Sequence, residues 1–170
     1  ERLNKAGITK MAAIHRGFSS FEKGPFRNAP MWEMPIELKT RIPELDIICD
    51  PSHITGARDL ISFVSQKALD LDMAGLMIES HITPDAAWSD AKQQITPSVL
   101  NKLLDGLIVR SASSENVNFK DTLGALREQI DQLDDEIMHK LSARMKISEK
   151  IGQYKKENGV TILQVSRWEE

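Results

Sequence analysis

Cysteine is almost absent from this 170-residue chain, in which Cys49 is the only one. A single cysteine excludes an internal disulfide framework and favours a reducing compartment, so we expect a cytoplasmic protein. The sequence also lacks a signal peptide and an apolar run of about 18 residues, so nothing predicts export or membrane insertion. The net charge is −3 and no basic patch is present, which argues against a nucleic-acid partner.

Proline is missing from the chain after Asn118, and the apolar residues there follow a helical pattern. They are separated by steps of three or four residues, at Leu123, Leu126, Ile130, Leu133, Ile137 and Leu141. We predict a helix over residues 118–157, roughly 60 Å long, with Gly159 able to cap its end. Such a helix needs another helix or another chain to cover its apolar face.

Widely spaced cations accompany this helix. Arg144 and Lys155 are separated by about three turns and share one face, whereas Arg127 is rotated by about 100° from them. Arg167 follows the turn. Spacing alone leaves two interpretations open: ordinary solvated cations beside glutamates, or sites for a dianion with Arg127 pointing into a different site.

The C-terminal motifs resemble those of the all-helical chorismate mutase family over roughly the last 50 residues. The matching pieces are Leu126–Asp134, Leu141–Arg144, Ile151–Lys155 and Arg167. The resemblance implies rearrangement of chorismate to prephenate by positioning and electrostatic stabilisation. By this resemblance, Arg144 and Arg167 bind the substrate carboxylates and Lys155 contacts the ether oxygen. Arg127 enters the active site of the partner subunit, which implies an intertwined homodimer. Trp168 departs from the family, which often has an acidic residue there.

The first 110 residues have a different pattern. Apolar segments at 10–15, 45–50 and 75–79 alternate with helix-like stretches at 57–71 and 97–107. This order predicts parallel βα units, whose functional residues lie beyond the carboxyl ends of the strands. Polar residues gather at those positions: His15, Arg16, Asp50, His53, Glu79, His81 and Asp90. They suit a divalent first-row metal and an anion, or simply polar strand caps and turns.

These segments resemble the short class of 3-deoxy-D-arabino-heptulosonate 7-phosphate (DAHP) synthases over residues 1–110. The matching pieces are Ile14–Phe18, Phe26–Asn28, Asp50–His53 with Gly56, Ile78–His81, Ala87–Asp90 and Gln93-Gln94. The resemblance implies a (β/α)8 barrel that condenses phosphoenolpyruvate with erythrose 4-phosphate. By this resemblance, His53, Glu79 and Asp90 bind a metal of the Mn, Fe, Co or Zn type. Arg16 contacts phosphoenolpyruvate, and Asp50 and Arg27 help to organise the substrates. His81 is expected to lie behind the metal ligands or to face the substrate, rather than to be a fourth ligand.

Cys49 directly precedes Asp50 on the predicted strand, so the two side chains point to opposite faces. We therefore expect a buried structural thiol rather than a replacement for the cysteine ligand of the DAHP synthases.

We expect an α/β plus all-α chain: the last three βα units of a barrel (1–110), a polar linker (111–118) and a partial mutase domain (119–170). The sequence is expected to be a piece of a bifunctional shikimate-pathway enzyme, inactive by itself, and a homodimer or higher oligomer in its intact form. The mutase part is expected to provide feedback regulation. The alternatives are that the helix is a non-catalytic dimerisation or effector-sensing arm, or that the barrel is a metal-dependent aldolase with another acceptor.

Overall fold

The computed structural model describes residues 2–21, 24–111 and 113–163. The chain divides into two compact units, residues 1–112 and residues 113–170. Their elements are α1 (Arg2–Lys5), β1 (Ala12–His15), α2 (Glu33–Arg41), β2 (Asp46–Cys49), α3 (Pro51–Thr55), α4 (Ile61–Asp70), β3 (Gly75–Leu76), the 3-10 helix η1 (Pro84–Ala86), α5 (Pro97–Gly106) and α6 (Val117–Glu157). No helix in the described part of the chain is long and apolar enough to cross a membrane.

The three strands form a parallel sheet in the order β1-β2-β3, as the alternation of apolar segments predicted. In the register, Ala13 lies opposite Ile47 and His15 lies opposite Cys49. The third strand is shorter than predicted, because only residues 75–76 pair with β2. The prediction that this strand extends to Glu79 is therefore wrong, and Glu79 lies in the loop that follows.

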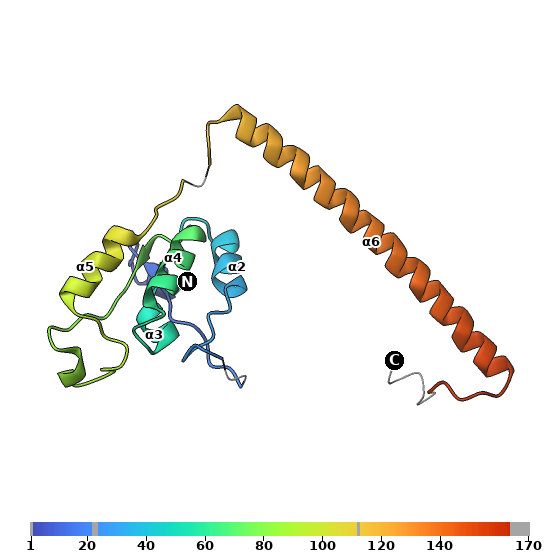
Figure 1. The fold of residues 1–170 in the computed structure, drawn as a ribbon, viewed down its shortest axis with the longest axis horizontal. Coiled ribbons are helices and arrows are strands. Elements are labelled where there is room, and N and C mark those ends of the chain that lie inside the picture. The colour runs from blue at the N-terminus through green and yellow to red at the C-terminus, as the bar shows by residue number, and fades with distance from the viewer. Residues whose placement is uncertain (1, 22–23, 112, 164–170) are drawn as a thin grey trace. The chain divides into compact units, whose positions relative to one another are not determined.

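The core lies between the sheet and the helices that follow β1 and β2 (Figure 1). It contains alternate residues of β2, one residue of α3, two of α4 and the methionine before β3: Ile47, Cys49, Ile54, Val64, Ala68 and Met73. Trp32 and Leu38, before and within α2, pack against it. Ile14 is on the opposite face of the sheet and is 48% exposed.

Helices α4 and α5 confirm predicted segments, whereas α2 and α3 were not predicted. Helices α4 and α5 lie within the stretches 57–71 and 97–107. Helix α2 was missed because prolines flank it, yet Pro35 is within its first turns, where proline is tolerated. Helix α3 was missed because Asp50-Pro51-Ser52 was interpreted as a turn; it is a helix start, with Asp50 as N-cap and Pro51 in the first turn.

The second unit consists of α6, a continuous helix of 41 residues (Figure 1). Its start is capped by Asn116, whose side chain accepts a hydrogen bond from the N–H of Phe119. Its end has two bonds of a Schellman motif, from Val160 N–H to Lys155 O and from Gly159 N–H to Lys156 O, and Gly159 has a φ of 65°. The long helix and the glycine at its end are confirmed.

Candidate active site at the carboxyl ends of the strands

His53 is held in place by the residue that starts its helix. One carboxylate oxygen of Asp50 accepts the backbone N–H of His53 at 3.0 Å, and the other lies 2.7 Å from His53 Nδ1. Asp50 is only 2% exposed. Because a carboxylate can only accept, Nδ1 carries the proton of this hydrogen bond, and in the neutral imidazole Nε2 offers its lone pair to the site. A carboxylate behind a histidine in this way is typical of metal-binding histidines.

Glu79 follows β3 and is fixed through its backbone. Its N–H donates to the hydroxyl of Ser52 at 3.0 Å, and its carbonyl accepts from Ile95 N–H at 3.2 Å. Ser52 is completely buried in α3. This side-chain contact ties the helix that carries His53 to the loop that carries Glu79, and Glu79 Oε1 lies 3.8 Å from His53 Nε2.

Asp90 lies in the loop after η1, in a left-handed backbone conformation with a φ of 49°. Aspartate adopts this conformation more readily than most residues. Arg27 Nη1 donates to its Oδ1 at 2.7 Å. This hydrogen bond lowers the pKa of Asp90, against the opposing effect of desolvation, so the carboxylate form is favoured.

The three predicted metal ligands are brought together. One ligand atom from each of His53, Glu79 and Asp90 lies within 4.8 Å of the others, and all three side chains are partly buried. One imidazole nitrogen and two carboxylates form a mixed N/O donor set, which fits a divalent first-row cation. The proton of His53 already faces Asp50, as a metal-binding histidine requires. The residues present therefore fit such an ion.

Arg16, at the end of β1, borders this cluster. Its Nε lies 3.7 Å from Asp50 Oδ2, and its side chain is 56% exposed, so the guanidinium can also reach an anion from solvent. Gly17 follows with a φ of 75°, and a Cβ there would lie 2.8 Å from both Asn28 Cβ and Asn28 O. Only glycine allows the turn that places Arg16.

Two polar residues of the strands face the core instead. His15 is 5% exposed and packs near the rings of Phe18 and Trp32, and its Nε2 has no hydrogen-bond partner. Burial lowers its pKa, with a smaller opposing effect of a hydrogen bond to the backbone carbonyl of Pro30. Cys49 is fully buried, and burial, together with the charge of Asp50, raises its pKa to about 12. The expected buried structural thiol is confirmed.

His81 is engaged in a local turn. Its Nδ1 accepts the backbone N–H of Thr83 at 2.9 Å, and its own N–H donates to Ile95 O. It is outside the group of three residues that could hold a metal.

Two contacts of the site were not given a role from sequence. Gln93, which is 1% exposed, bridges Glu79 and Arg27, and Asn28 donates to the carbonyl of His53 at 2.8 Å. Gln93 stood only among the motif residues that match the DAHP synthases. Its position three residues after Asp90 was the available signal, but a pattern along the chain does not show a bridge between loops.

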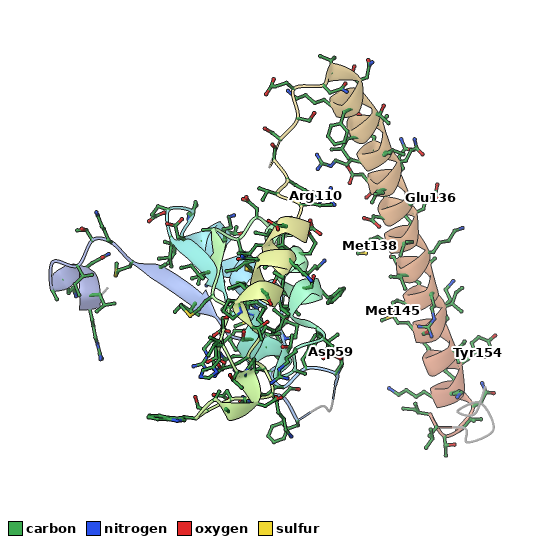
Figure 2. All side chains as sticks on the ribbon, turned by 60° about the vertical axis from the view of Figure 1, so that its left-hand side comes forward. Asp59, Arg110, Glu136, Met138, Met145 and Tyr154 are labelled. Atoms are coloured by element: carbon green, nitrogen blue, oxygen red, sulfur yellow. The ribbon has the colours of Figure 1, made fainter. Side chains whose placement is uncertain are left out.

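The predicted mutase cations lie on α6, except Arg167, which is outside the described residues. Arg127 and Arg144 are exposed, and Lys155 Nζ donates to Ile162 O at 2.8 Å. None of the described residues of α6 is buried. Figure 2 shows its side chains projecting around the helix, including the labelled Met138 and Met145. The unit contains no enclosed site among its described residues.

The fold and the site define a mixed α/β protein with a His-Glu-Asp cluster beyond the ends of parallel strands. Residues 1–114 match the family model described as the DAHP synthetase I family. The chain therefore belongs to the DAHP synthetase I family. Residues 126–170 match a second family model, chorismate mutase type II. The two matches confirm both resemblances.

A curated relative is the phospho-2-dehydro-3-deoxyheptonate aldolase of Thermotoga maritima, which is 33% identical over 104 residues. That alignment covers 61% of this chain and 30% of the relative. A crystal structure of the DAHP synthase from the same organism matches with a TM-score of 0.53 and 32% identity, over 61% of this chain and 30% of that one. A truncated form of the Thermotoga synthase matches with a TM-score of 0.53 and 29% identity, over 73% and 42% of the two chains. This chain thus spans less than half of these relatives.

Proposed function

We propose that this chain belongs to an enzyme that condenses phosphoenolpyruvate with erythrose 4-phosphate to DAHP. The observation that carries the proposal is the convergence of His53, Glu79 and Asp90 from three separate segments. The family match over residues 1–114 adds the reaction class. We further propose that the three strands and their helices belong to a (β/α)8 barrel, in which such a cluster would lie at the mouth.

His53, Glu79 and Asp90 would hold a divalent cation of the Mn, Fe, Co or Zn type. Bound there, it would supply Lewis acidity to an aldehyde oxygen. Arg16 would bind the carboxylate or phosphate of phosphoenolpyruvate, because its exposed guanidinium lies beside the cluster. Asp50 would contribute by orienting His53 and Arg16, since its oxygens face both side chains.

The experiment that tests this proposal is an assay of the protein expressed from its complete gene. Loss of phosphoenolpyruvate is followed with erythrose 4-phosphate and with other aldose phosphates, before and after removal of metal by a chelator. We expect consumption only with the tetrose phosphate, lost with the chelator and restored by a divalent ion. Equal rates with another aldose phosphate would instead identify an aldolase with a different acceptor.

We propose a second activity, rearrangement of chorismate to prephenate, because residues 126–170 match the chorismate mutase type II model. Arg144 and Lys155 share a face of α6 and would bind a carboxylate and the ether oxygen. Arg127 would reach the site of a second copy, and Arg167 would bind the other carboxylate. A transition state with separated charge is stabilised by cations of this kind.

Lys155→Ala tests this second activity, with Lys156→Ala as a matched control on a different face of the same turn. We expect mutase turnover to fall by orders of magnitude in the first variant only, with the oligomeric state unchanged in both. Unchanged turnover in Lys155→Ala would favour the alternative that α6 is a non-catalytic dimerisation or effector-sensing arm.

We also propose a homodimer through α6, because its apolar stripe is exposed in the single chain. Such a helix is stable when its apolar face is covered. A protein of this kind would work in the cytoplasm, which suits its single cysteine.

Feedback regulation is a further part of the proposal: prephenate or chorismate bound to the helical unit would lower the synthase rate. This requires two distinct sites and a coupling free energy between them. The synthase rate of the intact protein should then fall as prephenate is added, and a flat response over the binding range would contradict regulation without affecting either activity.

A further inference from the structure

The described part of the site contains a buried amide that connects its two carboxylates. Gln93 Nε2 donates to Glu79 Oε2 at 2.7 Å, and Gln93 Oε1 accepts from Arg27 Nη1 at 2.9 Å. The same Nη1 donates to Asp90 Oδ1 at 2.7 Å. One continuous chain of hydrogen bonds therefore runs from Glu79 through Gln93 and Arg27 to Asp90.

The chemistry of its neighbours fixes the orientation of the Gln93 amide. A guanidinium only donates and a carboxylate only accepts, so Oε1 must face Arg27 and Nε2 must face Glu79. Neither a shorter amide nor a residue with only acceptors satisfies both contacts. Gln93 is 1% exposed, so no solvent competes for these bonds, and losing either would leave a buried polar group unpaired.

The network occupies one oxygen of each carboxylate. Oε2 of Glu79 and Oδ1 of Asp90 are engaged by it, while Oε1 of Glu79 lies 3.8 Å from His53 Nε2, on the side of the proposed ion. The bonds thus orient each carboxylate and set the separation between the oxygens that remain for a cation. Fixed ligand positions reduce the ordering cost of binding.

Arg27 is itself held against the helix that carries His53. Its side-chain stem lies so close to Gly56 that a Cβ there would be 2.6 Å from Arg27 Cβ. Gly56 caps the end of α3 with a φ of 63°. Asn28, the residue after Arg27, donates to His53 O at 2.8 Å. The contacts of this segment therefore connect all three proposed ligands.

We infer that Gln93 is a positioning residue for the divalent cation: it orients Glu79 directly and Asp90 through Arg27, and so sets the affinity of the site. The inference rests on the proposed metal site and deepens it. Residues that hold metal ligands in place change metal affinity by about 10- to 100-fold when they are replaced.

The test is Gln93→Met, which keeps the approximate volume and removes both hydrogen bonds. Gln94→Met is a matched control, because the Gln94 side chain donates to Ser89 O and, among the described residues, forms no hydrogen bond with the three ligands. The protein expressed from its complete gene is freed of metal and titrated with Mn²⁺ by calorimetry. We expect Kd to rise about 10- to 100-fold in Gln93→Met and to stay within about twofold in the control. The thermal midpoint of each metal-free variant shows whether folding has changed.

A second variant tests the same network in case Gln93→Met does not fold. Arg27→Met keeps an aliphatic stem over Gly56 and removes the guanidinium of a side chain that is half exposed. We expect weaker Mn²⁺ binding here too. Because both residues act through one network, the double variant should lose less affinity than the sum of the two single losses in free energy.

The outcomes separate the inference from the function on which it rests. If Mn²⁺ binds the unsubstituted protein and His53→Ala abolishes binding, but Gln93→Met binds as tightly as Gln94→Met, the inference is overturned and the metal site stands. If the unsubstituted protein binds no divalent ion, or if His53→Ala binds it equally well, the proposed site fails and the inference fails with it.

Discussion

The sheet unit and the long helix obtain their order in different ways. In the sheet unit, residues such as Ile54 and Val64 are completely buried, and polar contacts connect segments far apart in sequence. No described residue of α6 is buried, and the polar contacts of its side chains, such as Lys155 Nζ with Ile162 O, are local in sequence. Site geometry in the first unit is therefore set within one chain, whereas the proposed site on the helix needs further protein to enclose it.

The largest expected effect is the difference in stability loss when isoleucine is replaced by alanine in each of the two units. Ile54→Ala removes a fully buried side chain and should cost about 2–5 kcal/mol of unfolding free energy. Ile137→Ala, at a position 55% exposed on α6, should change the stability of an unpartnered helix by no more than about 0.5 kcal/mol. Urea unfolding of both variants measures this. A loss at Ile137 of more than about 1 kcal/mol that shrinks as the protein is diluted would show that a second copy covers it.

Replacing a glycine by alanine should change the stability of the two units in opposite directions. Gly56→Ala places a Cβ 2.6 Å from Arg27 at a φ of 63°, so we expect a loss of about 1–3 kcal/mol. Gly124 lies inside α6 with nothing within 4 Å of an added Cβ, so Gly124→Ala should stabilise the helix by up to about 1 kcal/mol. Thermal unfolding monitored by circular dichroism would reveal both shifts. Destabilisation by Gly124→Ala would indicate a partner packed against that glycine.

Local patterns predicted the sheet and the helices α4, α5 and α6, but not α2, α3 or the contacts between elements. The alternation of apolar segments predicted the parallel sheet, and the three- and four-residue steps predicted α6, because both depend on neighbours in sequence. The hydrogen bond between Arg27 and Asp90 spans 63 positions, and its partners become visible only when the loops are folded. The cluster of His53, Glu79 and Asp90 was predicted through resemblance to a family, whereas the roles of Gln93 and Ser52 required the structure.

The buried His15 predicts an acid-sensitive sheet unit. Its pKa in the folded protein is lowered from the ordinary value of 6.5, so the unfolded chain binds a proton more readily. The free energy of unfolding that neutral His15 contributes is fully present above pH 6.5. It is lost as the pH falls through the lower pKa of the folded protein.

His15→Leu removes this titration and keeps an apolar side chain in the core. Urea midpoints at about pH 7.5 and roughly pH 5 should therefore differ less in the variant than in the unsubstituted protein. An identical pH dependence in both proteins would contradict a proton-linked contribution from His15.

The smallest expected effect concerns the start of each unit's last helix. Asn116 caps α6 by accepting from Phe119 N–H at 3.2 Å, and Thr96 caps α5 by accepting from Val99 N–H at 3.3 Å. Each substitution by alanine should cost about 1 kcal/mol. In α5 the loss should appear in the cooperative unfolding of the sheet unit. In α6, where no buried contact holds the first turn, it should appear as local fraying, measured by faster amide exchange over residues 117–120. Slow exchange there after Asn116→Ala would mean that tertiary contacts with other protein, rather than the cap, hold the start of the helix.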